Sequence, residues 1–218
     1  TKVVKNKKEF DQNKVDELIN SFPFNFTVDQ SKAINDILND LKSNSLMYRL
    51  IQGEVGSGKT AVAIIGLYAN YLAGYQGVLM APTEILAKQH YESLNHILSK
   101  FGVKVAVLYS SMDNERKVKE DIKNKNVDII VGTHALFSED VEYKDLGLVI
   151  ADEQHRFGVK QRQALKDKGE NVDFILMSST PIPRTLASSI YGDMDVSTIS
   201  SLPAGRKGCK TYFINKNS

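Results

Sequence analysis

The chain has 218 residues, of which 42% are hydrophobic and 25% are charged. These values are close to those of ordinary globular domains, so they exclude a disordered chain and a fibrous repeat, and the length suits one domain with a full core. The formal net charge of +2 gives no indication of a nucleic-acid binder, so any contact with DNA has to come from locally placed groups.

Cysteine content and hydropathy indicate the cellular compartment of the protein. Cys209 is the single cysteine, so it can form neither an internal disulfide nor a zinc site. The sequence has no run of about 18 apolar residues, and residues 1–8 lack the apolar stretch of a signal peptide. We therefore expect a soluble cytoplasmic protein with no membrane partner. Because the chain starts without Met and stops soon after a strand-like stretch, we also expect it to be part of a longer protein.

The first 45 residues contain helical patterns and no strand pattern. Apolar residues recur at helical spacing in residues 9–22 and 27–41. Lysines among the first eight residues could contact DNA, but charge runs usually form a solvated surface, so we predict a solvated tail. We assign residues 1–22 to an N-terminal helical extension, which is either an appendage to the domain that follows or a remnant of an upstream domain.

From residue 47 onwards, short apolar runs alternate with helical patterns. Buried strands are predicted at 47–52, 77–81, 103–109, 127–132, 146–151 and 174–178, and helices at 61–72, 85–98 and 113–123. This alternation predicts an α/β domain over residues 23–203, with a mostly parallel sheet and helices on both faces. The breaker-rich residues 203–208 indicate a linker, so residues 204–218 are assigned to a linker and the start of a second lobe.

The loop after the first predicted strand contains a complete phosphate-binding pattern. Residues 53–60 read GEVGSGKT, which fits G-x-x-x-x-G-K-[ST] with a strand before it and a helix after it. Glycines allow the backbone N–H groups to curl round phosphate oxygens, Lys59 would reach the β- and γ-phosphates of ATP, and Thr60 would offer its hydroxyl to Mg²⁺. A glycine turn that only caps a helix is the less favoured alternative. The predicted ATP-binding residues here are Gly53, Gly56, Ser57, Gly58, Lys59 and Thr60.

A second apolar strand pattern ends in two acids. Residues 148–153 read LVIADE, and Mg²⁺ in P-loop sites is shared between the loop hydroxyl and an acid at the end of another strand. We predict that Asp152 holds the metal, directly or through water, and that Glu153 is a catalytic residue, with Lys59, that orients and deprotonates the attacking water. Since ligands bind at the carboxyl ends of parallel strands, both motifs should lie at one edge of a RecA-like P-loop domain.

Longer stretches resemble the RecG family of superfamily-2 DNA helicases. Residues 152–162 (DEQHRFGVKQR) and 177–187 (MSSTPIPRTLA) resemble its Walker B box and motif III. Residues 161–165 and 191–196, the latter followed by 202–207, favour this family over the transcription-repair coupling factors. The resemblance covers about residues 22–213. It implies the first motor lobe of an ATP-dependent DNA helicase.

The resemblance assigns further roles near the nucleotide. Residues 24–30 (FNFTVDQ) resemble the adenine-reading segment, and the amide of Gln30 could make a two-pronged contact with the base. A surface position on a helix is the alternative for Gln30. Coupling between the γ-phosphate and DNA is assigned to His155, Ser178 and Thr180. His155 could instead be an ordinary hydrogen-bonded histidine.

DNA contacts are also implied by the resemblance. Residues 81–90 and 131–136 resemble motifs Ia and Ib, which hold the sugar–phosphate backbone in this family; the predicted contacts are Pro82, Thr83, Thr133 and His134. A strand ends and a helix begins at both places, so N–H groups and hydroxyls can bind phosphate without much positive charge. Simple N-capping by the two threonines remains an equal alternative.

Three positions depart from the family pattern. Glu54 stands where aspartate is usual, Ser179 where alanine is usual, and residues 109–111 (YSS) where the family has Thr-Gly-Ser. The first two changes are mild. The third removes a glycine from a loop expected to face DNA, which puts that contact in doubt.

The family likeness implies ATP and Mg²⁺ as cofactors and branched DNA, namely forks and Holliday junctions, as the partner of a monomeric helicase in recombination and repair. A second motor lobe with an arginine finger and an upstream wedge domain would belong to the same full-length chain, so the isolated chain should be poorly active. Three alternatives stay open: a coupling-factor translocase that acts on stalled RNA polymerase, a P-loop protein that phosphorylates a small molecule or signals by nucleotide state, and a nucleotide-binding module without turnover.

Overall fold

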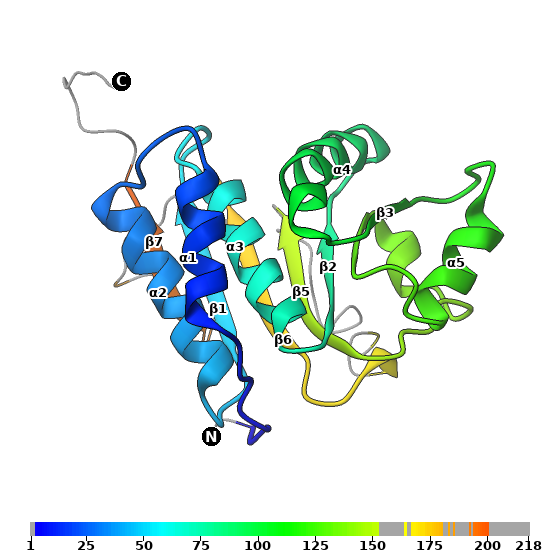
Figure 1. The fold of residues 1–218 in the computed structure, drawn as a ribbon, viewed down its shortest axis with the longest axis horizontal. Coiled ribbons are helices and arrows are strands. Elements are labelled where there is room, and N and C mark those ends of the chain that lie inside the picture. Colours follow the sequence, from blue (N-terminus) through cyan, green and yellow to red (C-terminus); the bar gives the residue numbers. More distant parts are fainter. Residues whose placement is uncertain are drawn as a thin grey trace.

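A computed structural model describes residues 3–152, 167–180 and 194–200, together with the single residues 164, 183, 185 and 192 (Figure 1). The strands are β1 (Tyr48–Gly53), β2 (Gln76–Met80), β3 (Val105–Leu108), β4 (Ile129–Gly132), β5 (Leu146–Asp152), β6 (Asp173–Ser178) and β7 (Asp195–Ile199). The helices are α1 (Gln12–Ser21), α2 (Val28–Lys42), α3 (Lys59–Leu72), α4 (Glu84–Leu98) and α5 (Glu115–Lys123), with 3₁₀ turns η1 (Ser99–Phe101) and η2 (His134–Phe137).

Within these ranges the strands form one sheet in the order β3-β4-β2-β5-β6-β1-β7, and every neighbouring pair is parallel. The predicted α/β fold with a parallel sheet is therefore confirmed. Six of the strands match predicted apolar runs, whereas β7 was not predicted. Its sequence, DVSTI, contains three polar residues, which an edge strand that pairs only with β1 tolerates.

Side chains on opposite faces of the sheet belong to two separate core clusters. Successive residues of a strand point to opposite faces, so Leu50 and Ile51 of β1 enter different clusters. The Ile51 cluster contains the buried faces of α1, α2, α3 and α4, whereas the Leu50 cluster contains those of α5 and η2. Each face of the sheet is thus covered by helical elements (Figure 1). No helix in the described part of the chain is both long and apolar enough to span a bilayer.

The N-terminal segment differs from the solvated tail predicted by its lysines. Lys5 and Lys8 are only 5% and 4% exposed, and their ammonium nitrogens lie 3.1 and 2.9 Å from Asp173 Oδ2 at the start of β6. Lys8 Nζ also donates to Asn70 Oδ1 (2.6 Å) and the Gly147 carbonyl (2.7 Å). Burial lowers the pKa of Lys8, and the Asp173 carboxylate opposes that shift. The prediction was wrong for Lys5 and Lys8 because acceptors distant in sequence surround their ammonium groups, whereas Lys7 is exposed as predicted.

The helical extension is docked on the core of the domain. The Asp11 carboxylate caps α1 by accepting a hydrogen bond from Asn13 N at 2.9 Å. Val15 and Leu18 are fully buried in the same cluster as α3, on which α1 packs. The boundary at residue 22 stays a prediction, and residues 204–218, including Cys209, lie outside the described residues.

Candidate functional site

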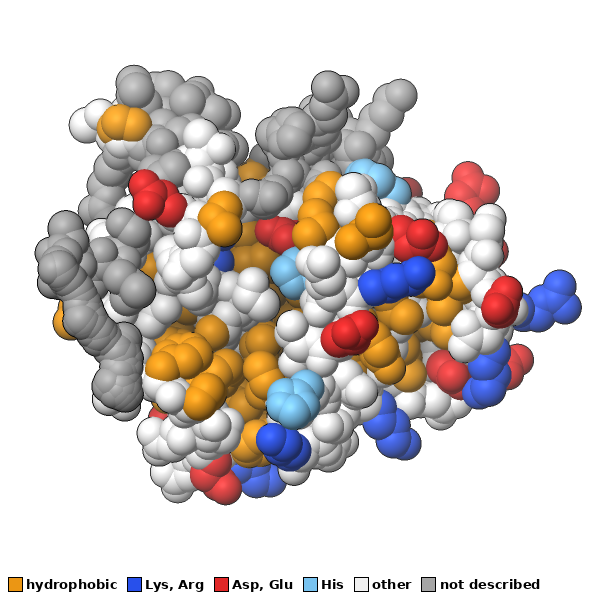
Figure 2. Space-filling model, turned by 90° about the horizontal axis from the view of Figure 1, so that it is seen from above, with side chains coloured by type: hydrophobic (Ala, Val, Ile, Leu, Met, Phe, Trp, Pro, Cys, Tyr) orange, Lys and Arg blue, Asp and Glu red, His pale blue; other side chains and the backbone are white. Residues whose placement is uncertain are grey.

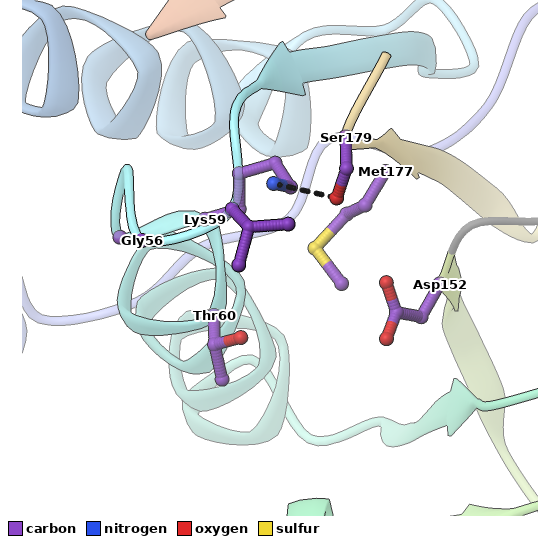
Figure 3. Close-up of a pocket in the computed structure, with 8 residues that line it drawn as sticks. Gly56, Lys59, Thr60, Asp152, Met177 and Ser179 are labelled. Atoms are coloured by element: carbon purple, nitrogen blue, oxygen red, sulfur yellow. Dashed lines mark hydrogen bonds between the residues drawn. The ribbon is translucent and has the colours of Figure 1, made fainter. Parts of the chain in front are cut away.

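The carboxyl ends of β1, β5 and β6 border a cavity of about 360 Å³ (Figure 3). Its lining residues are Val55, Gly56, Gly58, Lys59, Thr60, Asp152, Met177 and Ser179. Because β6 lies between β1 and β5 and all three run in parallel, the glycine-rich turn after β1 and the acid that ends β5 meet at one edge of the sheet. Lys59 and Asp152 therefore share a cavity, as the phosphate and metal motifs predicted.

Two features of the turn require glycine. Gly56 and Gly58 have φ angles of +86° and +88°, in the left-handed region that favours glycine. At Gly53, a Cβ atom would lie 2.6 Å from Ser57 Oγ and 2.8 Å from the Ile199 carbonyl oxygen. Glycine is therefore required at residues 56 and 58 by the backbone conformation, and at residue 53 by the close approach of Ser57 and of the end of β7.

The turn also offers polar groups suited to an anion. Among the described residues, the Ser57 hydroxyl is the buried side-chain group without a hydrogen-bond partner. The next helix, α3, begins at Lys59 without a side-chain cap at Gly58, so N–H groups of its first turn lack intrahelical acceptors. A triphosphate at this turn would satisfy both sets of donors, so the residues present fit an ATP-binding loop.

Lys59 lies at the wall of the cavity. Its side chain is largely buried, and Nζ donates to the carbonyl oxygens of Gly53 (2.7 Å) and Glu54 (3.2 Å) and contacts Ser179 Oγ at 3.2 Å (Figure 3). The Ser179 hydroxyl thus contacts the lysine that is predicted to bind phosphate. That contact was not evident from the sequence, in which the two residues lie on separate motifs.

Thr60 and Asp152 provide the oxygens predicted for the metal. The Thr60 hydroxyl and the Asp152 carboxylate face the same space from α3 and from the end of β5 (Figure 3). The described residues contain no group of three or more His, Cys, Asp or Glu side chains that could hold a metal by themselves. Mg²⁺ bound with a nucleotide uses one or two protein oxygens together with phosphate oxygens, so this donor set fits Mg²⁺-ATP. The metal role of both residues stays a prediction.

Gln30 links α2 to the phosphate turn. Its Nε2 donates to the Ser57 carbonyl (2.8 Å), and its Oε1 accepts from Thr27 N (2.8 Å) in a capping box that starts α2. Gln30 is 7% exposed, so the alternative of a surface helix position is wrong. An amide has two N–H donors and two lone pairs, and these bonds use one of each. The predicted contact with adenine, which no observation here tests, would use the others.

The coupling residues are only partly described. Ser178 ends β6, and its Oγ accepts a hydrogen bond from Thr180 N at 3.2 Å, so motif III starts at the same sheet edge as the cavity. Glu153 and His155 lie outside the described residues. The roles assigned to all four remain predictions.

The loops expected to hold DNA follow neighbouring strands. Pro82 and Thr83 come after β2, Thr133 and His134 come after β4, and these two strands pair with each other. Each threonine hydroxyl accepts a hydrogen bond from a backbone N–H of the following helical turn, at 3.2 Å in α4 and 3.4 Å in η2. N-capping by both threonines is therefore confirmed. Contact with phosphate stays a prediction, for which each hydroxyl still has its own hydrogen as donor.

The charge on this edge is dispersed. Figure 2 looks onto the strand ends, and on the described part of that face the Lys and Arg side chains stand apart instead of forming one patch. The altered loop at residues 109–111 lies nearby, after β3. Ser111 there has a φ of +66° and donates its N–H to Glu115 Oε1 at 3.1 Å, so this loop contains a left-handed residue that is not glycine.

Comparison with known proteins decides the family. The model of the DEAD/DEAH box helicase family matches residues 27–189, from the cap of α2 through motif III. The chain belongs to the DEAD/DEAH box helicase family. Helicases of this family use ATP, typically with Mg²⁺, which agrees with the oxygen donors and the phosphate turn of this helicase domain.

Individual relatives of this helicase domain narrow the similarity to RecG helicases. It is 50% identical over 210 residues to the ATP-dependent DNA helicase RecG of Bacillus subtilis (strain 168), covering 95% of this chain and 31% of the relative. The RecG of Thermotoga maritima is 49% identical over 201 residues, covering 91% and 26%. A solved structure of RecG bound to a three-way DNA junction aligns with a TM-score of 0.81 and 44% identity, over 91% of this chain and 27% of that one. The domain thus spans less than a third of the length of these relatives.

Two residues near the cavity were missed by sequence reasoning. Met177 is buried in β6 and lines the cavity, but an apolar residue in a strand carries no functional signal. His90 contacts Asp152, with 2.7 Å between Nε2 and Oδ2. A signal existed for His90, since it comes seven residues after Thr83 and two helical turns place it on the same face of α4.

Proposed function

We propose that this chain is the first ATP-binding motor lobe of a RecG-like DNA helicase. The whole protein would couple ATP hydrolysis to unwinding of branched DNA, fork reversal and Holliday junction branch migration in recombination and repair. The observation that carries the proposal is the meeting of Lys59, Thr60 and Asp152 in one cavity of a domain 44% identical to a RecG bound to a three-way junction.

The catalytic roles follow from the chemistry of phosphoryl transfer, in which positioning and electrostatic stabilisation dominate. The phosphate turn cradles ATP, Lys59 neutralises charge on the β- and γ-phosphates, and Gln30 reads adenine. Mg²⁺, when bound, neutralises negative charge on the oxygens of the β- and γ-phosphates. Thr60 and Asp152 would hold that ion beside the phosphates, and Glu153 would accept the proton of the attacking water.

The remaining motifs connect hydrolysis to DNA. Ser178, Thr180 and His155 sense the γ-phosphate. The loops of motifs Ia and Ib, with Pro82, Thr83, Thr133 and His134, bind phosphates of the DNA backbone. Two observations support this division: β6 leads from the cavity into motif III, and β2 and β4 bring the two DNA loops together at the same sheet edge.

A complete motor requires more than this lobe. We propose that a second motor lobe and an upstream wedge domain belong to the same full-length monomeric protein, since the chain spans 31% of its Bacillus subtilis relative. An arginine finger from another lobe typically raises the rate about 10³- to 10⁵-fold. The isolated chain should therefore bind ATP weakly and hydrolyse it slowly.

ATP hydrolysis by the full-length protein tests the proposal directly. Turnover is measured without DNA, with linear duplex, and with a three-way junction of the same base composition, for the wild type and for Asp152→Asn. We expect the junction to stimulate turnover at least about tenfold more than the duplex. Asp152→Asn should abolish turnover, since an amide cannot replace a charged ligand of the metal.

Three results would contradict parts of this assignment. Equal stimulation by duplex and junction would remove the branched-DNA substrate and favour a translocase of the coupling-factor type. ATP turnover that is the same with and without DNA would indicate a P-loop enzyme that acts on small molecules. Intact hydrolysis by Asp152→Asn would refute the metal role of this residue.

A further inference from the structure

His90 makes a short contact with the predicted metal ligand, although no role has been assigned to it above. His90 Nε2 lies 2.7 Å from Asp152 Oδ2, and the two side chains are only 15% and 13% exposed. Because an ionised carboxylate can only accept hydrogen bonds, this contact is a hydrogen bond in the tautomer of His90 whose Nε2 carries the hydrogen. The distance is typical of strong hydrogen bonds to a charged oxygen.

This hydrogen bond restrains the rotation of the Asp152 carboxylate. Asp152 is the last residue of β5, and its side chain projects into the cavity toward α3, where Thr60 lies (Figure 3). A donor held against one carboxylate oxygen limits rotation about the Cβ–Cγ bond and therefore sets the direction of the other oxygen. A carboxylate that is already held in its binding orientation binds a cation without the entropic cost of fixing that orientation.

The donor itself is held in place by packing. His90 lies in the second turn of α4, a helix of 15 residues that is capped by Thr83. Ala87, Leu94 and Leu98 of this helix are fully buried in the core cluster on its face of the sheet. Donors on a packed helix keep their position more exactly than donors on loops, as a functional site requires.

We propose that His90 is a positioning residue for Mg²⁺: it orients Asp152 so that the carboxylate and Thr60 can share the ion. This inference rests on the proposed function, because it needs Asp152 to be a metal ligand. Removing a group that hydrogen-bonds a metal-ligating side chain typically lowers metal affinity or activity about 10- to 100-fold. The competing explanation is that His90 only anchors α4 to the end of β5, which would affect folding stability and leave the metal unchanged.

A metal titration separates the two explanations. A fluorescent, non-hydrolysable ATP analogue is bound to the full-length protein, first in EDTA and then with increasing Mg²⁺. The variants are His90→Ala, which lacks the donor, and His90→Gln, whose amide nitrogen can reach a similar position. His96→Ala is the matched control, because His96 is an exposed histidine of the same helix. Thermal unfolding is recorded for each variant.

We expect His90→Ala to raise the Mg²⁺ concentration for half-saturation about tenfold or more, with nucleotide affinity in EDTA within about twofold of the wild type. His90→Gln should recover most of the loss, and His96→Ala should match the wild type. If His90→Ala does not fold, His90→Phe fills the same space without a donor and makes the same test.

Two results would overturn the inference alone. One is an unchanged Mg²⁺ requirement in His90→Ala, and the other is an equal loss of affinity with and without Mg²⁺, which indicates a structural role. A wild-type protein that binds the analogue without any dependence on Mg²⁺ would overturn both this inference and the metal site of the proposed function.

Discussion

Both edges of the sheet contain buried polar side chains, but the two clusters differ in how their groups are partnered. At the amino edge, Asp173 accepts hydrogen bonds from Lys8 Nζ and Met47 N and forms an ion pair with Lys5. Lys8 has two further acceptors in Asn70 and Gly147, and Lys5 has another in a backbone carbonyl. Each charged group of this cluster is enclosed by partners within the protein.

The carboxyl edge is arranged differently. It combines an unpartnered buried hydroxyl on Ser57, left-handed glycines, and a cavity into which Thr60 and Asp152 face (Figure 3). Buried polar groups in native proteins are almost always hydrogen-bonded, so a cluster with full partners stabilises the fold, and one with unmet donors beside a cavity suits a ligand. The comparison teaches that burial of charge alone does not identify a functional site.

The largest effect is expected at the amino edge, on stability. Asp173→Ala leaves two buried ammonium groups without their carboxylate, so we expect the free energy of unfolding to fall by about 3–5 kcal/mol. Urea denaturation measures this. Lys117→Ala, which breaks the exposed pair with Asp121, is the control and should leave stability unchanged. A loss below about 1 kcal/mol in Asp173→Ala would mean that the cluster is not structural.

A smaller effect is expected from a side chain added to the phosphate turn. Gly58→Ala puts a Cβ at a φ of +88°, where it would overlap Gln30 Nε2, whereas Gly74→Ala has a φ of +98° and open space around it. Backbone strain should lower the stability of both by about 1–2 kcal/mol. Only Gly58→Ala should lose ATP affinity, by about tenfold or more, as measured by equilibrium binding. Equal affinity in both variants would show that the contact between Gln30 and the turn has no bearing on the nucleotide.

Base selectivity provides a finer test. Gln30→Ala and Thr27→Ala both break the capping box of α2, at a cost of about 1 kcal/mol each. We expect the preference for ATP over GTP to fall about tenfold in Gln30→Ala, the loss of roughly one hydrogen bond, and to persist in Thr27→Ala. Competition binding with the two nucleotides measures the ratio. Parallel changes in both variants would assign Gln30 to capping and leave adenine recognition to other residues.

The smallest effect concerns the DNA loops. Thr83→Asp keeps an N-cap for α4 but replaces a phosphate donor by an acceptor, so DNA affinity should fall about three- to tenfold. Ser93→Asp adds the same charge at an exposed position of the same helix and serves as the control. Fluorescence anisotropy with a labelled junction, repeated at several salt concentrations, measures both. An equal loss of DNA affinity in the two variants would show that Thr83 caps α4 and does not bind phosphate.

Much of the fold and the phosphate site could be predicted because their signals are local. The spacing in residues 53–60 indicates a turn that only glycine permits, and the apolar runs for six strands reflect burial on both sheet faces. The placement of Asp152 beside Lys59 followed from one rule, that parallel strands bring their carboxyl ends to the same edge. The strand β7 escaped detection because an edge position tolerates polar residues, which weakens the apolar pattern.

What the sequence by itself determined was therefore the class of domain and the chemistry of its phosphate turn, since both depend on residues near one another in the chain. The tertiary structure alone decided that Lys5 and Lys8 are buried, that Ser179 contacts Lys59, and that His90 holds Asp152. These contacts join residues that are far apart in the sequence. Their existence depends on the order of strands in the sheet and on how each helix packs, and helical spacing in the sequence could suggest only the face of α4 on which His90 lies.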